Sequence, residues 1–255
     1  MDTVKSIILW PFICRCVCIS LRMLGWIMNW DIVGKARIFE QLDSDTARDI
    51  FEQLHPKCVE LNKNDILIRD GQLVNSFAIV EEGALNAAKL YADGSQSLLL
   101  KFEPSYVAAV DIAATKKKVS TYYITAGKKS KVHLIDYNYI SKPGKIREEY
   151  RLLMMESVLA LIAGENIRKM YKIEILSRKG LRDKILVFLA IQQSFYGERE
   201  FKIAYNREEL ADYLCVNRSA LSHELRSMEQ EHLIYCRKNY FKILDARLYN
   251  RDELR

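Results

Sequence analysis

The apolar and polar positions of the chain fall into four successive patterns. Residues 6–30 are almost continuously apolar, residues 58–136 alternate over short runs between glycine turns, and residues 143–176 repeat apolar positions every three to four residues. Residues 178–250 show helical periodicity again, followed by one short alternating run. Alternation predicts strands and the longer repeat predicts helices, so the chain is expected to be an α+β protein.

The alternating stretch predicts a β-roll or barrel of short strands. Gly71, Gly83 and the Asp93-Gly94 pair mark turns between its apolar runs, and many short strands at this spacing are typical of such folds. The expected strands cover residues 66–68, 77–80, 84–91, 97–102, 122–126 and 132–135. A short helix or pair of helices is expected before them, over residues 39–54.

A long helix is expected to begin at Pro143-Gly144 and to run to about Leu176. Its apolar residues fit the a and d positions of one heptad frame, which is the pattern of a coiled-coil seam. The frame holds Leu152, Met155, Leu159, Ile162, Ile173 and Leu176, with Asn166 and Lys169 as polar exceptions. We therefore predict a dimer helix with Leu152, Met155, Leu159, Ile162, Asn166 and Ile173 at the interface. The alternative is a helix that packs on its own β-roll.

Two helices joined by a short turn are predicted near the end of the chain. Asn206 is a candidate N-cap, and Glu209 stands three residues later, as in a capping box. Cys215 and Val216 form the expected turn, and Asn217 is a second N-cap candidate. A new helix is therefore expected to begin at Arg218 and to continue to about residue 230.

The second of these helices has one apolar face and one polar face. Leu221, Leu225 and Met228 share the apolar side, whereas Ser219, His223, Arg226 and Gln230 share the opposite side. A hairpin over residues 235–244, with Arg237, Lys238 and Asn239 at its tip, is expected to follow. A polar helix that precedes a basic hairpin is suited to a DNA major groove and its phosphates. The alternative is an ordinary amphipathic helix pair.

Specific DNA contacts follow from this placement. The predicted base-reading residues are Ser219, Ser222 and His223, and the predicted backbone contacts are Asn217, Arg218, Arg226, Arg237 and Lys238. If His223 is charged when bound, DNA affinity should weaken as the pH rises.

The helix pair resembles the helix-turn-helix of the Crp/Fnr family of bacterial transcription regulators. The resemblance rests on the run Asn217-Arg218-Ser219-Ala220-Leu221-Ser222, on Met228 and on Leu233-Ile234, and it extends over roughly residues 36–250. It implies a β-roll effector domain of the cyclic-nucleotide-binding (cupin-like) type, a long dimerisation helix and a C-terminal winged helix-turn-helix. It also implies a homodimer that reads a near-palindromic operator through the helix over residues 218–230.

Several residues depart from that family pattern. Cys215 and His232 stand where the family usually has glycine, at positions that favour a residue tolerant of positive φ. Ser219 and His223 stand where the family often has Glu and Arg, so no known operator sequence is carried over.

Four segments follow from the patterns and the resemblance. They are an apolar N-terminal extension (1–30), the effector domain (31–142), the dimerisation helix (143–177) and the DNA-binding domain (178–250). Arg15 and Arg22 argue against a membrane-spanning helix in the extension. The extension is interpreted as upstream of a true start at Met23 or Met28, as an interfacial anchor, or as a segment packed on the body. We favour the first.

The effector pocket is expected to lack the residues that hold a cyclic nucleotide. In the family, a Gly-Glu pair and an Arg beside Ser or Thr bind the ribose and phosphate. The corresponding positions here are Ala109, Val110, Ser120 and Thr121. Val cannot accept a hydrogen bond and Ser cannot form a bidentate ion pair. Cyclic AMP is therefore not expected as a ligand, and the effector, an unknown small molecule, is left open.

The cysteine spacing and the absence of catalytic motifs limit which other classes of protein are expected. Cys14, Cys16 and Cys18 alternate too tightly for an iron–sulfur site, so no such cofactor is expected. No other metal site and no catalytic residue is expected either. A membrane-associated or redox-sensing regulator that uses this N-terminus is the alternative function. The sequence shows neither a nucleophile set nor a phosphate-binding loop, so an enzyme is not expected.

The net charge of +6 is mild, and residues 178–255 hold 15 basic and 12 acidic residues, half of that excess. Expected partners are double-stranded DNA, a second copy of the chain and, from the resemblance, RNA polymerase. A membrane is not an expected partner. The family implies a cytoplasmic activator, although the residues do not separate activation from repression.

Overall fold

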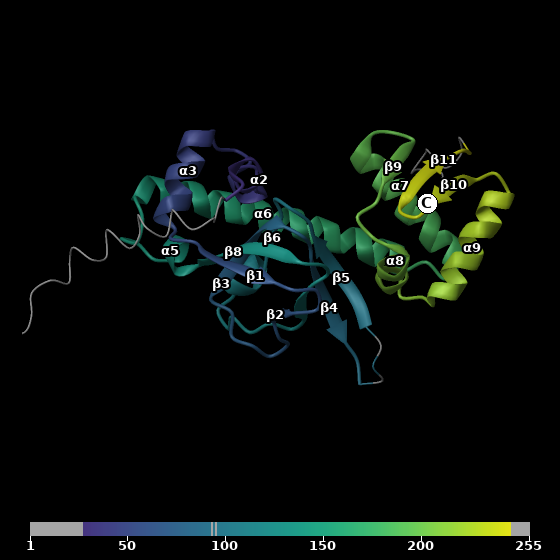
Figure 1. Ribbon diagram of the computed structural model, residues 1–255, viewed down its shortest axis with the longest axis horizontal. Helices are drawn as coiled ribbons and strands as arrows, with labels where there is room; N and C mark the ends of the chain where they lie inside the picture. Colours follow the sequence, from purple (N-terminus) through teal and green to yellow (C-terminus); the bar gives the residue numbers. More distant parts are fainter. Residues whose placement is uncertain (1–27, 93, 95, 246–255) are drawn as a thin grey trace, which may run out of the picture.

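The computed structural model describes residues 28–245 except Asp93 and Ser95. The expectations for residues 1–27, including Cys14, Cys16, Cys18 and the alternative start at Met23, lie outside the described residues. Figure 1 shows a β-roll and a small C-terminal domain joined by one long helix. No helix within the described ranges has the length and apolar character needed to cross a membrane.

The β-roll consists of two antiparallel four-stranded sheets, with the strand orders β1-β8-β3-β6 and β2-β7-β4-β5. Their strands are β1 (Lys57–Leu61), β2 (Ile66–Ile68), β3 (Ser76–Glu82), β4 (Leu85–Leu90), β5 (Gln96–Phe102), β6 (Val107–Ala108), β7 (Tyr123–Ala126) and β8 (Ser130–Asp136). Apolar residues from both sheets meet in one core that includes Val80, Leu85, Phe102 and Ile124. The roll predicted from the alternating pattern is confirmed.

Two strands of the roll were missed by the sequence pattern. β1 mixes charged and half-buried positions and is recognised only through its pairing with β8, from Lys57 opposite Leu134 to Leu61 opposite Ser130. β6 contains only two residues and pairs with β3. Both strands depend on partners that are distant in sequence, so local periodicity could not identify them.

Short helices cover one end of the roll and build a second core. They are α2 (Trp30–Val33), the 3-10 helix η1 (Arg37–Phe39), α3 (Ser44–Gln53), α4 (Val110–Ala113) and α5 (Asn138–Ser141). Asp43 caps α3 by accepting hydrogen bonds from the N–H groups of Asp45 and Thr46. Phe39 and Ile50 pack there against Phe77 of β3, so this end of the roll is closed by helices.

The long helix α6 extends over Glu148–Leu176 and joins the two domains (Figure 1). It begins later than the predicted Pro143, because Gly144 has a φ of +75° and Arg147 has an extended backbone. Met154, Val158 and Leu161 lie on the face that packs against the core beneath the short helices.

The C-terminal domain is a helical core with a small sheet. It comprises α7 (Leu181–Tyr196), β9 (Glu200–Lys202), α8 (Arg207–Leu214), α9 (Arg218–Gln230), β10 (Ile234–Arg237) and β11 (Tyr240–Ile243). The sheet has the order β10-β11-β9. Phe188, Leu214, Leu225 and Phe241 come together in its core, which gives a winged helix-turn-helix.

Direct polar contacts join this domain to the β-roll. The Nζ of Lys101 in β5 donates to the Oε2 of Glu209 in α8 at 2.6 Å and to the carbonyl of Ala204 at 2.7 Å. Gln96 donates to Asp212 at 2.7 Å. The first helix of the pair is therefore attached to the β-roll.

Candidate nucleic-acid interface

The first helix of the pair, α8, begins with the predicted capping box. The side chain of Asn206 accepts from the N–H groups of Glu208 and Glu209 at 2.9 and 3.0 Å. The carboxylate of Glu209 in turn accepts from the N–H of Asn206 at 2.8 Å. Reciprocal capping of this kind satisfies N–H groups that a helix leaves free. It fixes where α8 starts.

The two positions expected to need positive φ have it. Cys215, which ends α8, has a φ of 54°, and His232, beyond the end of α9, has a φ of 57°. The turn between α8 and α9 therefore has the expected left-handed residue, although that residue is not a glycine. L-residues carry a steric cost in this region, so both residues are strained.

The second helix, α9, is held from behind. Leu221, Leu225 and Met228 are buried, as its apolar stripe predicted. Arg182 of α7 donates to Glu224 at 2.6 Å and to Glu231 at 2.7 Å. The hydrogen bond from Arg182, together with that from Ser227, lowers the pKa of Glu231. The buried stripe and the guanidinium together fix the rotation of α9.

The opposite face of α9 is exposed to solvent. Ser219, Ser222, His223 and Arg226 all lie on it, together with Arg218 at the helix start. The hydroxyl of Ser222 donates to the carbonyl of Arg218 at 2.9 Å, which leaves its oxygen able to accept. The helix thus presents small polar groups and a cation at the surface, a composition suited to base edges and phosphates.

Asn217 occupies the N-cap position of α9 but its side chain makes no capping hydrogen bond. The predicted position is confirmed and the capping interaction is not seen. Its exposed amide is therefore not used by the helix, which keeps it available for a phosphate contact.

The wing is braced against the helix pair. Asn239 at its tip donates to the carbonyl of Ile203 at 3.0 Å, and Arg207 of α8 donates to the carbonyl of Lys238 at 3.2 Å. Arg237 and Lys238 are exposed. Two cations are thereby held at the tip of a fixed hairpin beside the exposed face of α9.

Two of these bracing residues, Arg182 and Arg207, were missed by sequence reasoning. Arg182 binds Glu224, which lies 42 residues away in the sequence, and Arg207 binds Lys238, which lies 31 residues away. A single arginine on an amphipathic helix carries no local signal of such a partner, so nothing in the sequence pattern distinguished them from solvated cations.

The predicted effector residues lie in and beside the core of the β-roll. Ala109 is buried with a φ of 66°, and Val110 is buried at the start of α4. The buried hydroxyl of Ser120 donates to the carbonyl of Tyr122 and accepts from its N–H, whereas Thr121 is exposed. The polar capacity of Ser120 is therefore used within the protein.

The predicted dimer residues are mostly exposed on the single chain. Leu152, Met155, Leu159 and Ile173 have 45–70 % of their surface exposed, and Asn166 is exposed as well. Ile162 differs, because it is half-buried against the core of the short helices.

The exposed stripe on α6 also departs from the predicted heptad frame further along. Lys169, an apparent exception in the frame, pairs with Asp111 at 3.0 Å. Ile167 and Met170 are exposed instead, at 54 % and 56 %. The apolar stripe therefore continues through these two residues.

Comparison with known proteins supports both halves of the description. Residues 184–248 match the Crp-like helix-turn-helix domain. The C-terminal domain belongs to the Crp-like helix-turn-helix family. The match includes the helix pair α8 and α9 and the wing strands β10 and β11. No curated protein matches the chain.

Solved structures share the fold over 78–83 % of the chain. FixK2 from Bradyrhizobium japonicum is 16 % identical with a TM-score of 0.61, covering 78 % of this chain and 95 % of its own. A putative crp/fnr regulator from Eubacterium rectale is 21 % identical with a TM-score of 0.53, covering 83 % and 95 %. The global regulator CLP from Xanthomonas campestris is 11 % identical with a TM-score of 0.61, covering 80 % and 100 %. The expected fold is confirmed.

Proposed function

We propose that the protein acts as a homodimer that reads a near-palindromic DNA site through α9, with the wing on flanking phosphates. The observation that carries this proposal is the exposed face of α9, where Ser219, Ser222 and His223 face solvent opposite a buried apolar stripe. A helix held in this way can enter a major groove without repacking.

The dimer is supported by the exposed stripe on α6. Leu152, Leu159 and Ile173 are separated by seven and fourteen residues, and they are 54–70 % exposed. Large apolar side chains along one helix face favour association with a second helix. Two parallel copies of α6 would place two copies of α9 on one side of the assembly, as a two-fold symmetric site requires.

The effector is proposed to be something other than cyclic AMP. Val110 offers no acceptor for a ribose hydroxyl, and the hydroxyl of Ser120 is bonded to Tyr122. Calorimetry with cyclic AMP should therefore show no micromolar binding, and saturable micromolar binding would contradict this part of the proposal. No cofactor is proposed, and RNA polymerase is proposed as the partner in activation.

Selection from a random pool of duplex DNA tests the proposal, with the full chain and no added ligand. We expect an enriched motif of two inverted half-sites, with centres about one helical turn (~34 Å) apart. A single half-site would contradict the dimer. Failure of a folded dimer to enrich any motif would contradict DNA binding without an effector.

Matched variants separate base reading from phosphate contact. Ser219→Ala and His223→Ala should change the preferred bases within each half-site, because their side chains lie on the exposed face of α9. Lys57→Ala removes an exposed cation that lies on β1 of the β-roll, outside the C-terminal domain, and should change neither the motif nor its enrichment. An unchanged motif with both α9 variants would remove these residues from the reading role.

A further inference from the structure

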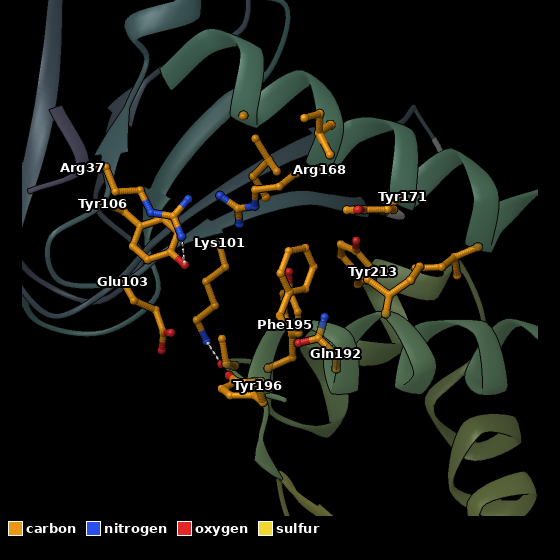
Figure 2. Close-up of a pocket in the computed structure, with 17 residues that line it drawn as sticks. Arg37, Lys101, Glu103, Tyr106, Arg168, Tyr171, Gln192, Phe195, Tyr196 and Tyr213 are labelled. Atoms are coloured by element: carbon orange, nitrogen blue, oxygen red, sulfur yellow. Dashed lines mark hydrogen bonds between the residues drawn. The ribbon is translucent and has the colours of Figure 1, made fainter. Parts of the chain in front are cut away.

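A cavity of about 530 Å³ lies where the β-roll, α6 and the C-terminal domain meet. Figure 2 shows side chains from these elements converging on it. Six aromatic side chains line it, namely Tyr106, Tyr171, Phe195, Tyr196, Tyr205 and Tyr213. Its volume lies within the range of small-molecule sites, and aromatic walls are suited to a flat ring. It is separate from Ala109, Val110, Ser120 and Thr121, the predicted effector residues.

Arg168 supplies a cationic group to this cavity. One guanidinium N–H donates to Glu165 at 2.7 Å, and Figure 2 shows the guanidinium directed from α6 toward the space between Tyr106 and Phe195. Its remaining N–H groups have no hydrogen-bond partner among the described residues. A planar guanidinium with free N–H groups binds a carboxylate through two parallel hydrogen bonds.

Two phenols add neutral donors. Burial raises the pKa of Tyr205, and it raises the pKa of Tyr213 to about 12, so both hydroxyls stay protonated at neutral pH. Both side chains are about nine-tenths buried. Neither hydroxyl has a hydrogen-bond partner in the described part of the chain. Neither hydroxyl oxygen is among the fully buried atoms without a partner, and both side chains line the cavity, so each hydroxyl is free to donate to a molecule bound there.

The other charged groups of the lining are already engaged or lie to one side. Lys101 binds Glu209 and the carbonyl of Ala204. Arg37 donates to the hydroxyl of Tyr106 at 2.7 Å and stacks on its ring. Glu103 is the carboxylate of the lining, and Figure 2 shows it at the side of Arg37 and Tyr106, away from Phe195 and Tyr213.

We propose that this cavity binds a planar aromatic carboxylate. Its carboxylate would lie on Arg168 and accept from the phenols of Tyr205 and Tyr213, and its ring would stack among the aromatic side chains. The cavity has a cationic group at one end and aromatic walls along the rest. An aromatic acid is complementary to it, because it carries a negative carboxylate at one end of a flat ring. A neutral aromatic molecule would leave the free N–H groups of Arg168 without a partner.

Calorimetry with the full chain and 2-naphthoate tests the site, with 2-naphthalenemethanol as the uncharged analogue. Benzoate and indole-3-carboxylate extend the range of ring sizes. We expect one saturable site per chain for at least one acid, and binding of the alcohol that is at least about tenfold weaker. No saturable binding of any acid to the folded protein would overturn the proposal. Equal affinity for the alcohol would overturn the role of the carboxylate.

Two pairs of variants locate the site. Arg168→Gln should weaken the acid at least about tenfold and leave the alcohol unchanged, and Arg168→Lys should give an intermediate loss. Gly164 lines the cavity, and a Cβ added there meets no atom within 4 Å, so the backbone accepts a side chain at this position. Gly164→Phe should therefore block both ligands, whereas Gly164→Ala should retain them.

Circular dichroism and sedimentation complete the test. Acid binding that survives both Arg168→Gln and Gly164→Phe in folded protein would place the site elsewhere and overturn the proposal. If Arg168→Gln weakens dimerisation and not ligand affinity, a second copy of the chain fills the cavity, and the proposal is wrong. The assay contains no DNA, so its result is independent of the proposed operator binding.

Discussion

At the scale of single residues, two non-glycine residues of the helix-turn-helix adopt a backbone conformation that L-amino acids disfavour. Cys215 and His232 both adopt left-handed conformations. The ring of His232 is exposed and lies outside α9, so its identity contributes little besides backbone strain. Glycine is free of that strain because it has no Cβ.

His232→Gly should therefore raise the free energy of unfolding by about 1 kcal/mol. Chemical denaturation measures the change. His232→Ala serves as the control, because it removes the ring and keeps the Cβ, and it should give no comparable gain. Equal stabilities for the two variants would show that the strain at this position is negligible.

A buried ionisable cluster makes the β-roll sensitive to acid. The fully buried carboxylate of Glu81 pairs with Lys131 at 2.9 Å and with His133 at 2.6 Å, and it accepts from the N–H of Asn29 at 2.8 Å. Burial alone would raise the pKa of Glu81, but these hydrogen bonds bring it below its usual value of 4.5. Burial lowers the pKa of His133 below its usual 6.5, against the opposing effect of Glu81.

The lowered pKa values of His133 and Glu81 both make the folded protein less stable in acid. Below pH 6.5 the unfolded chain binds a proton at His133 that the folded chain resists, and below pH 4.5 the same applies to Glu81. We expect the free energy of unfolding to fall as the pH is lowered from 7 to 5, and to fall further below 4.5. Urea denaturation across this range measures it. His133→Gln should flatten the upper part of the curve, and a wild-type slope in this variant would show that another group is responsible.

At the scale of elements, α6 carries an apolar stripe that the single chain leaves uncovered. Leu159 is 70 % exposed and central in this stripe. Leu159→Glu should convert the dimer into a monomer, because it places a charge in the seam, and should change the stability of the chain itself little. Sedimentation equilibrium measures the association.

Leu90→Glu is the matched control for the dimer prediction. Leu90 is 47 % exposed at the end of β4, outside the stripe, so the same substitution should leave the dimer intact. A Leu159→Glu protein that remains fully dimeric would show that the stripe is not the dimer interface.

The wing is expected to act through charge. Arg237 is exposed at the end of β10, so Arg237→Gln should weaken DNA binding similarly for all sequences and reduce the slope of log affinity against log salt by about 1. Fluorescence anisotropy at several salt concentrations, with a selected and a scrambled duplex, measures both quantities. A loss confined to the selected duplex would instead assign Arg237 to base reading.

At the scale of the whole molecule, the orientation of the helix-turn-helix depends on buried contacts between domains. Lys172 of α6 donates to the carbonyl of Leu98 in β5 and lies 4.5 Å from the ring centre of Tyr213 in α8. Burial lowers the pKa of Lys172 to about 8. One side chain thus joins α6, the β-roll and the C-terminal domain.

The lowered pKa of Lys172 gives stability a defined pH dependence. Between pH 8 and 10 the unfolded chain holds a proton at Lys172 that the folded chain releases, so stability should rise with pH in this window. Lys172→Met should abolish the rise and increase stability at pH 7 by on the order of 1–2 kcal/mol, because it removes a buried charge. Thermal denaturation from pH 7 to 9.5 measures this effect. A persistent rise in the variant would exclude Lys172 as its source.

Local sequence was sufficient for features that depend on local interactions. The capping box of Asn206 and Glu209, the turn at Cys215 and the buried stripe of α9 each involve residues within a few positions of one another. Helix caps and amphipathic periodicity are properties of consecutive residues. The amino-acid sequence alone is therefore enough to assign the candidate DNA-binding face.

Tertiary structure decided the features that join distant segments. Glu209 completes its capping box and also binds Lys101, 108 residues away, and no periodicity relates the two. The same applies to the cavity around Arg168, whose walls come from the β-roll, from α6 and from the C-terminal domain. The sequence by itself determined the helix-turn-helix and most strands of the roll, because caps, turns and stripes are encoded locally, whereas β1 and β6 depend on distant partners. Only the packing of the domains decided which side chains meet between them, because those contacts depend on how the whole chain folds.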